Sequence, residues 1–145
     1  MSQTFTRNSR VQVGERVLQI KRTLGNGAFG VVYKVRDVAS SKIYALKDVA
    51  CFNASAIRKA CREVETMYQI SHENVIALKG ADKFNDAQGL HMLILTEYCA
   101  GGNLNERLNW PSSEELNFKW MLQASGALAY LHSCRVVHQI GRAHV

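Results

Sequence analysis

The feature of the sequence that most limits the possible folds is the stretch Gly-Asn-Gly-Ala-Phe-Gly at residues 25–30. Glycines in this G-x-G-x-x-G spacing let backbone amides approach phosphate oxygens without interference from a Cβ atom. The motif occurs in two unrelated settings, where it either opens a helix or joins two antiparallel strands. Residues 31–35, Val-Val-Tyr-Lys-Val, form strands readily and helices poorly. The sequence therefore predicts a glycine-rich hairpin whose backbone is suited to phosphate. An ordinary glycine-rich hairpin turn without a ligand is the simpler alternative.

Apolar patterning predicts a sheet followed by helices. We expect strands at residues 17–24, 31–35, 43–49, 75–84 and 90–98, the first three forming an antiparallel meander. Asn53 is a candidate N-cap for a helix that continues to residues 71–72, with apolar positions Ile57, Ala60, Cys61, Val64, Met67 and Tyr68. A short helix at 103–109 and a long helix after a Ser112–Glu115 capping box follow. These elements predict an α+β fold in two lobes, with a five-stranded sheet and one helix in the first.

Composition and charge narrow the classes of partner. The 145 residues carry 18 Lys and Arg against 12 Asp and Glu, a net charge of +6, but the charges are scattered and no run of five like charges occurs. This argues against a nucleic-acid-binding surface. No apolar stretch reaches the roughly 18 residues that a membrane span needs, and the N-terminus has no apolar signal-peptide core. We therefore expect a cytoplasmic or nuclear chain without a nucleic-acid or membrane partner.

The four cysteines agree with a reducing compartment. Cys51, Cys61, Cys99 and Cys134 are irregularly spaced, and no C-x-x-C pair or zinc-like spacing with histidine occurs. We expect reduced, mostly buried thiols, although a disulfide framework is possible in principle.

One lysine stands among apolar neighbours in the third expected strand. In an extended chain Lys47 shares one face with Ile43, Ala45 and Val49. A lysine in such surroundings is costly unless it is paired or contacts an anion. Glu63, in the helix that follows, is the candidate partner. Considered separately, each residue has a simpler interpretation: Lys47 as a strand lysine that faces solvent, and Glu63 as a solvated carboxylate on a helix.

Five motifs in this order resemble the N-terminal lobe of a eukaryotic protein kinase. They are the glycine-rich stretch at 24–33, Ala-Leu-Lys at 45–47, Arg-Glu at 62–63, His-Glu-Asn-Val at 72–75 and Thr-Glu-Tyr at 96–98. The resemblance extends from about residue 17 to residue 138. It implies a protein-kinase-like fold, ATP and Mg²⁺ as cofactors, and a protein hydroxyl as the acceptor of the γ-phosphate.

The same resemblance implies roles for individual residues. The three glycines of the motif would cover the ATP phosphates, and Lys47 would hold the α- and β-phosphates while paired with Glu63. Val32 and Ala45 would sandwich the adenine, Thr96 would be a small gatekeeper, and the backbones of Glu97 and Cys99 would contact the adenine edge. Asn103 would lie near the ribose, and His138 would be the structural histidine of the catalytic loop. The expected nucleotide-binding set is Leu24, Gly25, Gly27, Gly30, Val32, Ala45, Lys47, Thr96, Glu97 and Cys99, with Lys47 and Glu63 as the catalytic pair and no metal ligand.

The resemblance stops at His138. Residues 139–145, Gln-Ile-Gly-Arg-Ala-His-Val, stand where the family continues with an arginine, the catalytic aspartate and the magnesium ligands. The codons ATC GGA AGA GCA CAC GTC would encode residues 140–145 and match the start of a common sequencing adaptor. We therefore expect a flexible N-terminus at 1–15, a kinase N-lobe at 16–99, a hinge exit with a partial C-lobe at 100–139, and a non-native tail at 140–145. The chain as given is expected to be inactive.

The sequence leaves open the specificity of the kinase and two alternative classes of protein. Serine/threonine specificity is favoured over tyrosine, and residues 97–108, 118–124 and 127–132 are similar to the serine/threonine kinase subfamily that binds PDZ–LIM proteins. A non-catalytic, pseudokinase-like binder of ATP or protein is the main alternative. A Rossmann-type cofactor binder would need a helix after Gly30 and an acidic residue about 20 positions further on.

Overall fold

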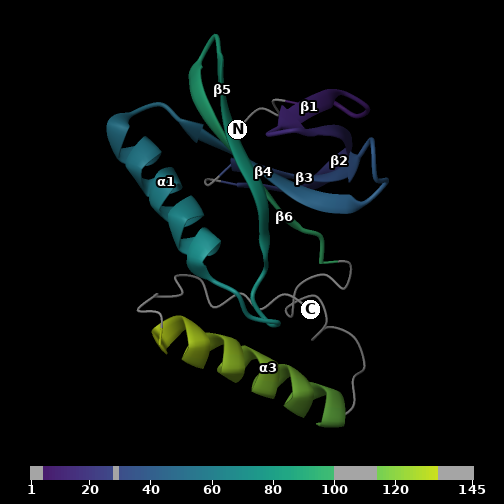
Figure 1. The fold of residues 1–145 in the computed structure, drawn as a ribbon, viewed down its shortest axis with the longest axis vertical. Coiled ribbons are helices and arrows are strands. Elements are labelled where there is room, and N and C mark those ends of the chain that lie inside the picture. Colours follow the sequence, from purple (N-terminus) through teal and green to yellow (C-terminus); the bar gives the residue numbers. More distant parts are fainter. Residues whose placement is uncertain (1–4, 28–29, 100–113, 134–145) are drawn as a thin grey trace. The chain divides into compact units, whose positions relative to one another are not determined.

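The computed structural model describes residues 5–27, 30–99 and 114–133 (Figure 1). The chain divides into two compact units. The first contains residues Met1–Tyr68 and Leu78–Tyr98, and the second contains Gln69–Ala77 and Cys99–Val145.

The first unit is built on one antiparallel sheet of six strands. The strands are β1 (Arg10–Val13), β2 (Arg16–Gly27), β3 (Gly30–Asp37), β4 (Ile43–Cys51), β5 (Leu78–Asp86) and β6 (Gly89–Glu97). Their order in the sheet is β1-β2-β3-β4-β6-β5, and every neighbouring pair is antiparallel. Helix α1 (Ala54–Gln69) enters the chain between β4 and β5 and lies beside the sheet in Figure 1.

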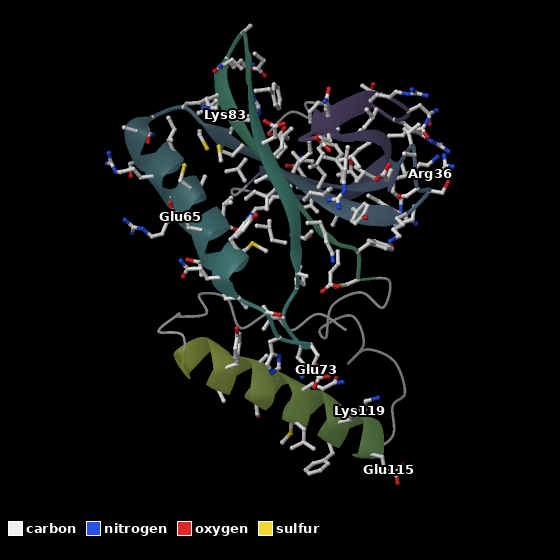
Figure 2. The ribbon with its side chains drawn as sticks, in the orientation of Figure 1. Arg36, Glu65, Glu73, Lys83, Glu115 and Lys119 are labelled. Carbon is white, nitrogen blue, oxygen red and sulfur yellow. The ribbon has the colours of Figure 1, made fainter. Side chains whose placement is uncertain are left out.

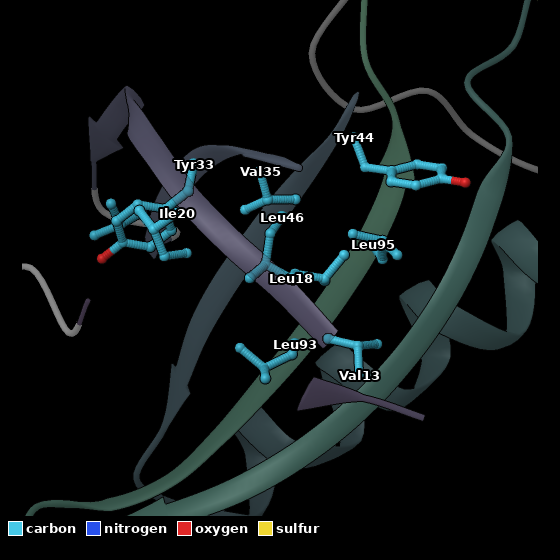
Figure 3. Packing of buried hydrophobic residues seen from close by; sticks show 10 residues of the cluster. Val13, Leu18, Ile20, Tyr33, Val35, Tyr44, Leu46, Leu93 and Leu95 are labelled. Atoms are coloured by element: carbon cyan, nitrogen blue, oxygen red, sulfur yellow. The ribbon is translucent and has the colours of Figure 1, made fainter. Parts of the chain in front are cut away.

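The sheet has an enclosed face and an open face, because successive residues of a strand point to opposite sides. Along β4, Tyr44, Leu46 and Asp48 are buried, whereas Ala45 and Lys47 are only half-buried. The enclosed face carries the hydrophobic core, whose buried side chains are drawn in Figure 3. Its members are Val13, Leu18, Ile20, Val31, Tyr33, Val35, Tyr44, Leu46, Leu93 and Leu95.

The two edge strands of the sheet approach each other and close over the core. The backbone N–H of Gly14, in the turn after β1, donates to Asp82 Oδ2 of β5 at 2.9 Å. Arg16 Nη1 donates to the carbonyl of Lys79 at 2.5 Å. The segment before β1 also contributes, because the N–H of Phe5 donates to the Tyr33 hydroxyl at 3.2 Å and its ring packs edge-on against Tyr33. Phe5 therefore helps to enclose the core.

The sheet has one strand more than the five expected. β1 lies at residues 10–13, where the sequence predicted no strand, and it forms by pairing with β2. β2 also continues through Gly25 to Gly27, where we expected the strand to end at Leu24. Both additions depend on hydrogen bonds to a neighbouring strand, which local strand propensity does not report.

Helix α1 begins after Asn53, as predicted. Asn53 Oδ1 accepts from the N–H of Ala56 at 2.8 Å, which is an N-cap contact. The helix ends at Gln69, short of the expected residues 71–72. Of its six expected apolar positions, Cys61 and Tyr68 are exposed, Tyr68 by 81%. Their exposure corrects both the expected apolar face and the expectation that the thiols are mostly buried, since of the three described cysteines only Cys51 is buried.

The second unit contains helix α3 (Glu114–Ser133), which confirms the predicted long helix. Within this unit the hydroxyl of Tyr130 accepts from the N–H of Ser71 at 2.9 Å, and its ring lies 5.0 Å from that of His72. The expected short helix at 103–109, the Ser112 half of the capping box, and Cys134 lie outside the described residues.

Candidate functional site

The glycine-rich stretch is a hairpin between two strands. Gly27 pairs with Gly30, and Gly25 pairs with Val32, in the ladder that joins β2 to β3. Because the residues after Gly30 form a strand and not a helix, the Rossmann alternative is wrong for this motif. Gly25 and Gly27 are exposed, and a Cβ atom built on either would meet nothing within 4 Å. The hairpin therefore presents open backbone on which a ligand can lie.

At Gly30, unlike Gly25 and Gly27, the backbone conformation and the packing both require a glycine. Its φ of 132° is one that other residues rarely adopt, and a Cβ atom there would collide with the carbonyl oxygen of Asp48. The return of the hairpin is thus packed directly on the backbone of β4. This contact brings the glycine-rich hairpin next to the strand that carries Lys47.

Lys47 and Glu63 form an ion pair on the open face of the sheet. Lys47 Nζ lies 3.2 Å from Glu63 Oε1, and the two side chains remain 30% and 42% exposed. The pair joins β4 to α1, two elements that are otherwise only lightly connected. The sequence predicted this pairing, and the structure brings the two residues together.

The other expected nucleotide contacts of the first unit lie on strands that neighbour Lys47. Val32 is directly opposite Lys47 on β3, and Ala45 is directly opposite Thr96 on β6. All three of Val32, Ala45 and Thr96 are half-buried. Opposite residues on paired strands share a face, so these side chains line the same open face as Lys47.

The end of β6 completes the described part of the site. Thr96 Oγ1 donates to the carbonyl of Glu97 at 3.3 Å, and Lys34 Nζ lies 5.0 Å from the centre of the Tyr98 ring. Leu24, near the end of β2, is 36% exposed. Cys99 is half-buried and belongs to the second unit. Asn103 and His138 lie outside the described residues.

This arrangement suits a polyphosphate. Exposed glycine backbone lets a ligand approach without obstruction by a Cβ atom, and the Lys47 ammonium is a point charge for phosphate oxygens. Half-buried apolar side chains on the same face suit the flat surface of a base. The residues present therefore fit ATP. Within residues 5–27, 30–99 and 114–133, no cluster of three His, Cys, Asp or Glu side chains is placed to hold a metal ion.

Comparison with known families shows which class of nucleotide-binding protein this chain resembles. The model of the protein kinase domain matches residues 18–139. The chain belongs to the protein kinase family. The match includes the glycine-rich hairpin, Lys47, Glu63 and the end of β6.

Curated relatives are similar over most of the chain. "Serine/threonine-protein kinase 1" of Arabidopsis thaliana is 33% identical over 120 residues, 80% of this chain and 14% of the relative. "Calcium-dependent protein kinase 5" of Oryza sativa is 33% identical over 124 residues, 81% of this chain and 22% of the relative. "Aurora kinase" of Schizosaccharomyces pombe is 29% identical over 128 residues, 85% of this chain and 35% of the relative. The chain thus spans well under half the length of these kinases.

Among the helices that the structure describes, none is long and apolar enough to cross a membrane.

One feature beside the site was not predicted. Asp48, next to Lys47 in sequence, is 2% exposed and points to the enclosed face of the sheet. The alternation that places Lys47 on the open face requires this of its neighbour. A carboxylate at that position was therefore a signal in the sequence for a buried partner.

Proposed function

We propose that the full-length protein is a serine/threonine protein kinase that transfers the γ-phosphate of ATP to protein hydroxyls. The observation that carries the proposal is the 3.2 Å Lys47–Glu63 pair on the face beside the glycine-rich hairpin. The names of several relatives, which are serine/threonine-protein kinases, support serine/threonine specificity. They do not support the narrower resemblance to the PDZ–LIM-binding subfamily, which forms no part of the proposal. A cytoplasmic or nuclear location stays a prediction.

The residues of this chain would contribute binding and positioning. Phosphoryl transfer depends mainly on alignment of the reacting groups and neutralisation of their charge. ATP, when bound, supplies the phosphoryl group. The backbone of Gly25 and Gly27 would lie over the phosphates, and the Lys47 ammonium would offset their negative charge. Glu63 would hold that ammonium in place, because without a partner the flexible lysine side chain would sample many rotamers.

The test is phosphoryl transfer by the full-length protein with labelled ATP and a mixture of protein substrates. Lys47→Met removes the ammonium and keeps much of the side-chain volume. We expect a loss of activity on the order of 10²-fold or more, as when another preorganised charge-stabilising group is removed from an active site. Lys42→Met is the matched control, since Lys42 is an exposed lysine just before the same strand, and this variant should keep wild-type activity.

The outcomes separate the candidate functions. Undiminished transfer by Lys47→Met would contradict the proposed role of the site. Stabilisation of the full-length protein by ATP without any transfer would indicate a pseudokinase-like binding module instead. Phosphorylation confined to tyrosine would overturn serine/threonine specificity alone.

A further inference from the structure

A histidine is buried between two carboxylates on the enclosed face of the sheet. His91 of β6 is 5% exposed, and its Nδ1 lies 2.7 Å from Asp48 Oδ1 of β4. Its Nε2 lies 2.8 Å from Asp86 Oδ2, at the end of β5. Asp86 is held as a carboxylate, because the N–H of Gln88 and the neighbouring His91 keep its pKa below the usual range. Nothing in the nucleotide site described above uses this cluster.

The contacts of His91 favour a charged ring. A neutral imidazole has one N–H and would turn a lone pair toward one of the two carboxylates, whereas the imidazolium has an N–H for each. Nε2 is buried and lies close to Asp86, but outside hydrogen-bond geometry, so charge attraction accounts for this contact better than a neutral hydrogen bond does. The titratable groups that face His91 are Asp48 from β4 and Asp86 from β5. Cys51 lies nearby at the end of β4, where burial raises the pKa of its thiol.

Aromatic contacts connect His91 to the start of helix α1. The Phe84 ring stacks on His91 with centroids 4.6 Å apart, and the Phe52 ring meets it edge-on at 6.0 Å. Gly89 leaves room for this arrangement, since a Cβ atom there would come within 2.8 Å of the Phe52 ring. Phe52 immediately precedes the helix N-cap Asn53. The position of His91 thus bears on the point where α1 begins.

Helix α1 has few other attachments to the sheet. Ala60 is the only buried residue among the sixteen of the helix. Its described polar contacts with the sheet include the Lys47–Glu63 pair, and Glu63 lies about two and a half turns from the N-terminus of the helix. A shift at the start of such a lightly held helix would change where Glu63 meets Lys47.

We propose that charged His91, held between Asp48 and Asp86, is a positioning residue. Its contact with Phe52 fixes the position at which α1 begins, and this position allows Glu63 to pair with Lys47. The inference rests on the proposed nucleotide-binding role of that pair. It makes nucleotide affinity dependent on pH. As the pH rises and the ring loses its second proton, one of the two carboxylates faces a lone pair of the ring. His91 is then held less firmly, so Phe52 and the start of α1 are less well fixed and ATP binds more weakly.

The experiment measures the affinity of the full-length protein for ATP at a series of pH values, and ¹⁵N NMR follows the protonation of the His91 ring in the same samples. In the wild type, affinity should fall as the pH rises, and ¹⁵N NMR should show both ring nitrogens of His91 protonated at the acidic end. His91→Gln should bind ATP about tenfold more weakly at the acidic end and lose most of the pH dependence. His72→Gln, which alters a histidine of the second unit, is the matched control and should keep the wild-type profile.

A double-mutant cycle tests the route through Glu63. If His91 acts on Glu63, then His91→Gln should weaken ATP binding in the wild type but add little in a Glu63→Gln background. A purely structural role would give equal effects in both backgrounds. Phe52→Ala covers the case in which His91→Gln does not fold, because Phe52 is 56% exposed and its loss leaves the buried charges in place. It should reproduce the weaker binding.

Each result decides the inference. A wild-type profile that matches His91→Gln, additive effects in the cycle, or unchanged binding by Phe52→Ala would overturn it. The affinity readout does not require transfer, so a full-length protein that binds ATP without phosphorylating protein would contradict the proposed kinase activity and still test His91.

Discussion

The two faces of strand β4 differ in what they contribute to the molecule. On the enclosed face, Tyr44 and Leu46 are buried within the core (Figure 3). On the open face, Ala45 and Lys47 are half-buried and lie beside the glycine-rich hairpin. The same backbone therefore fixes both sets of side chains, one residue apart. Burial of the first set stabilises the strand, and that stability allows the second set to carry polar groups that contribute little to folding.

The comparison implies that the two faces can be damaged separately. Truncation on the enclosed face should destabilise the protein strongly, because close-packed cores do not fill a cavity without cost. Alteration on the open face should weaken nucleotide binding while the fold remains. The predictions below test this separation with variants that are close in position and type.

The largest expected effect is that of Leu46→Ala. Leu46 has no exposed surface, and its removal should lower the free energy of unfolding by about 2–5 kcal/mol. Val49→Ala, on the open face of the same strand, should cost about 1 kcal/mol, because Val49 is only half-buried and loses fewer carbons. Urea unfolding followed by circular dichroism measures both. Equal losses for the two variants would mean that the faces are not distinct in stability.

Alternation within strands made one part of this comparison predictable from sequence. Residues 43–49 placed Lys47 with Ala45 and Val49, and the structure shows those three on the half-buried face. The strand-forming residues after Gly30 likewise predicted the hairpin. Both inferences depend on neighbours in the sequence, where propensity and periodicity are informative.

The parts that sequence reasoning missed depend on contacts between distant residues. Strand β1 is short, and it exists through its pairing with β2. Cys61 and Tyr68 follow a helical period but are exposed, because α1 buries only Ala60 and its apolar face is wider than its contact with the sheet. His91 meets its carboxylates only once three strands are assembled. Alternation along β4 is enough to place Asp48 on the enclosed face, but no local pattern reports which residues meet it there.

A smaller effect on the fold, but a clear one on binding, is expected for Glu63→Gln. The pair with Lys47 is partly exposed, so its loss should change the free energy of unfolding by less than about 1 kcal/mol. The affinity for ATP should nevertheless fall about tenfold, as expected when a charge-assisted contact of roughly 1.4 kcal/mol is lost. Glu65→Gln is the matched control, because Glu65 is an exposed carboxylate two residues away on the same helix (Figure 2).

Isothermal titration with ATP and thermal unfolding of the same samples would measure the two quantities. If Glu63→Gln lowered stability as much as Leu46→Ala, the pair would belong to the structural part of the molecule. Equal affinities for Glu63→Gln and Glu65→Gln would remove Glu63 from the site.

The smallest expected effect concerns the closure of the sheet over its enclosed face. The N–H groups of Gly14 and Lys83 hold the pKa of Asp82 below its model-compound value of 3.8. A carboxyl whose pKa is lowered by folding stabilises the fold above its unfolded pKa, and this contribution is lost as the pH falls through the folded pKa. Asp82→Asn should therefore be less stable than the wild type near neutral pH, by less than about 1 kcal/mol at this exposed position. The two proteins should become equally stable in acid.

Urea unfolding at a series of pH values from neutral down to about pH 2 measures this convergence, since Asp82 is protonated at the acidic end. Glu15→Gln is the control, because Glu15 is an exposed carboxylate in the turn next to Gly14 and should show no such convergence. A constant difference between Asp82→Asn and the wild type across the whole range would show that the ionised form of Asp82 is not what joins the edge strands. Closure would then depend on the Arg16–Lys79 contact, which also reaches β5, and on the packing of Phe5 against Tyr33.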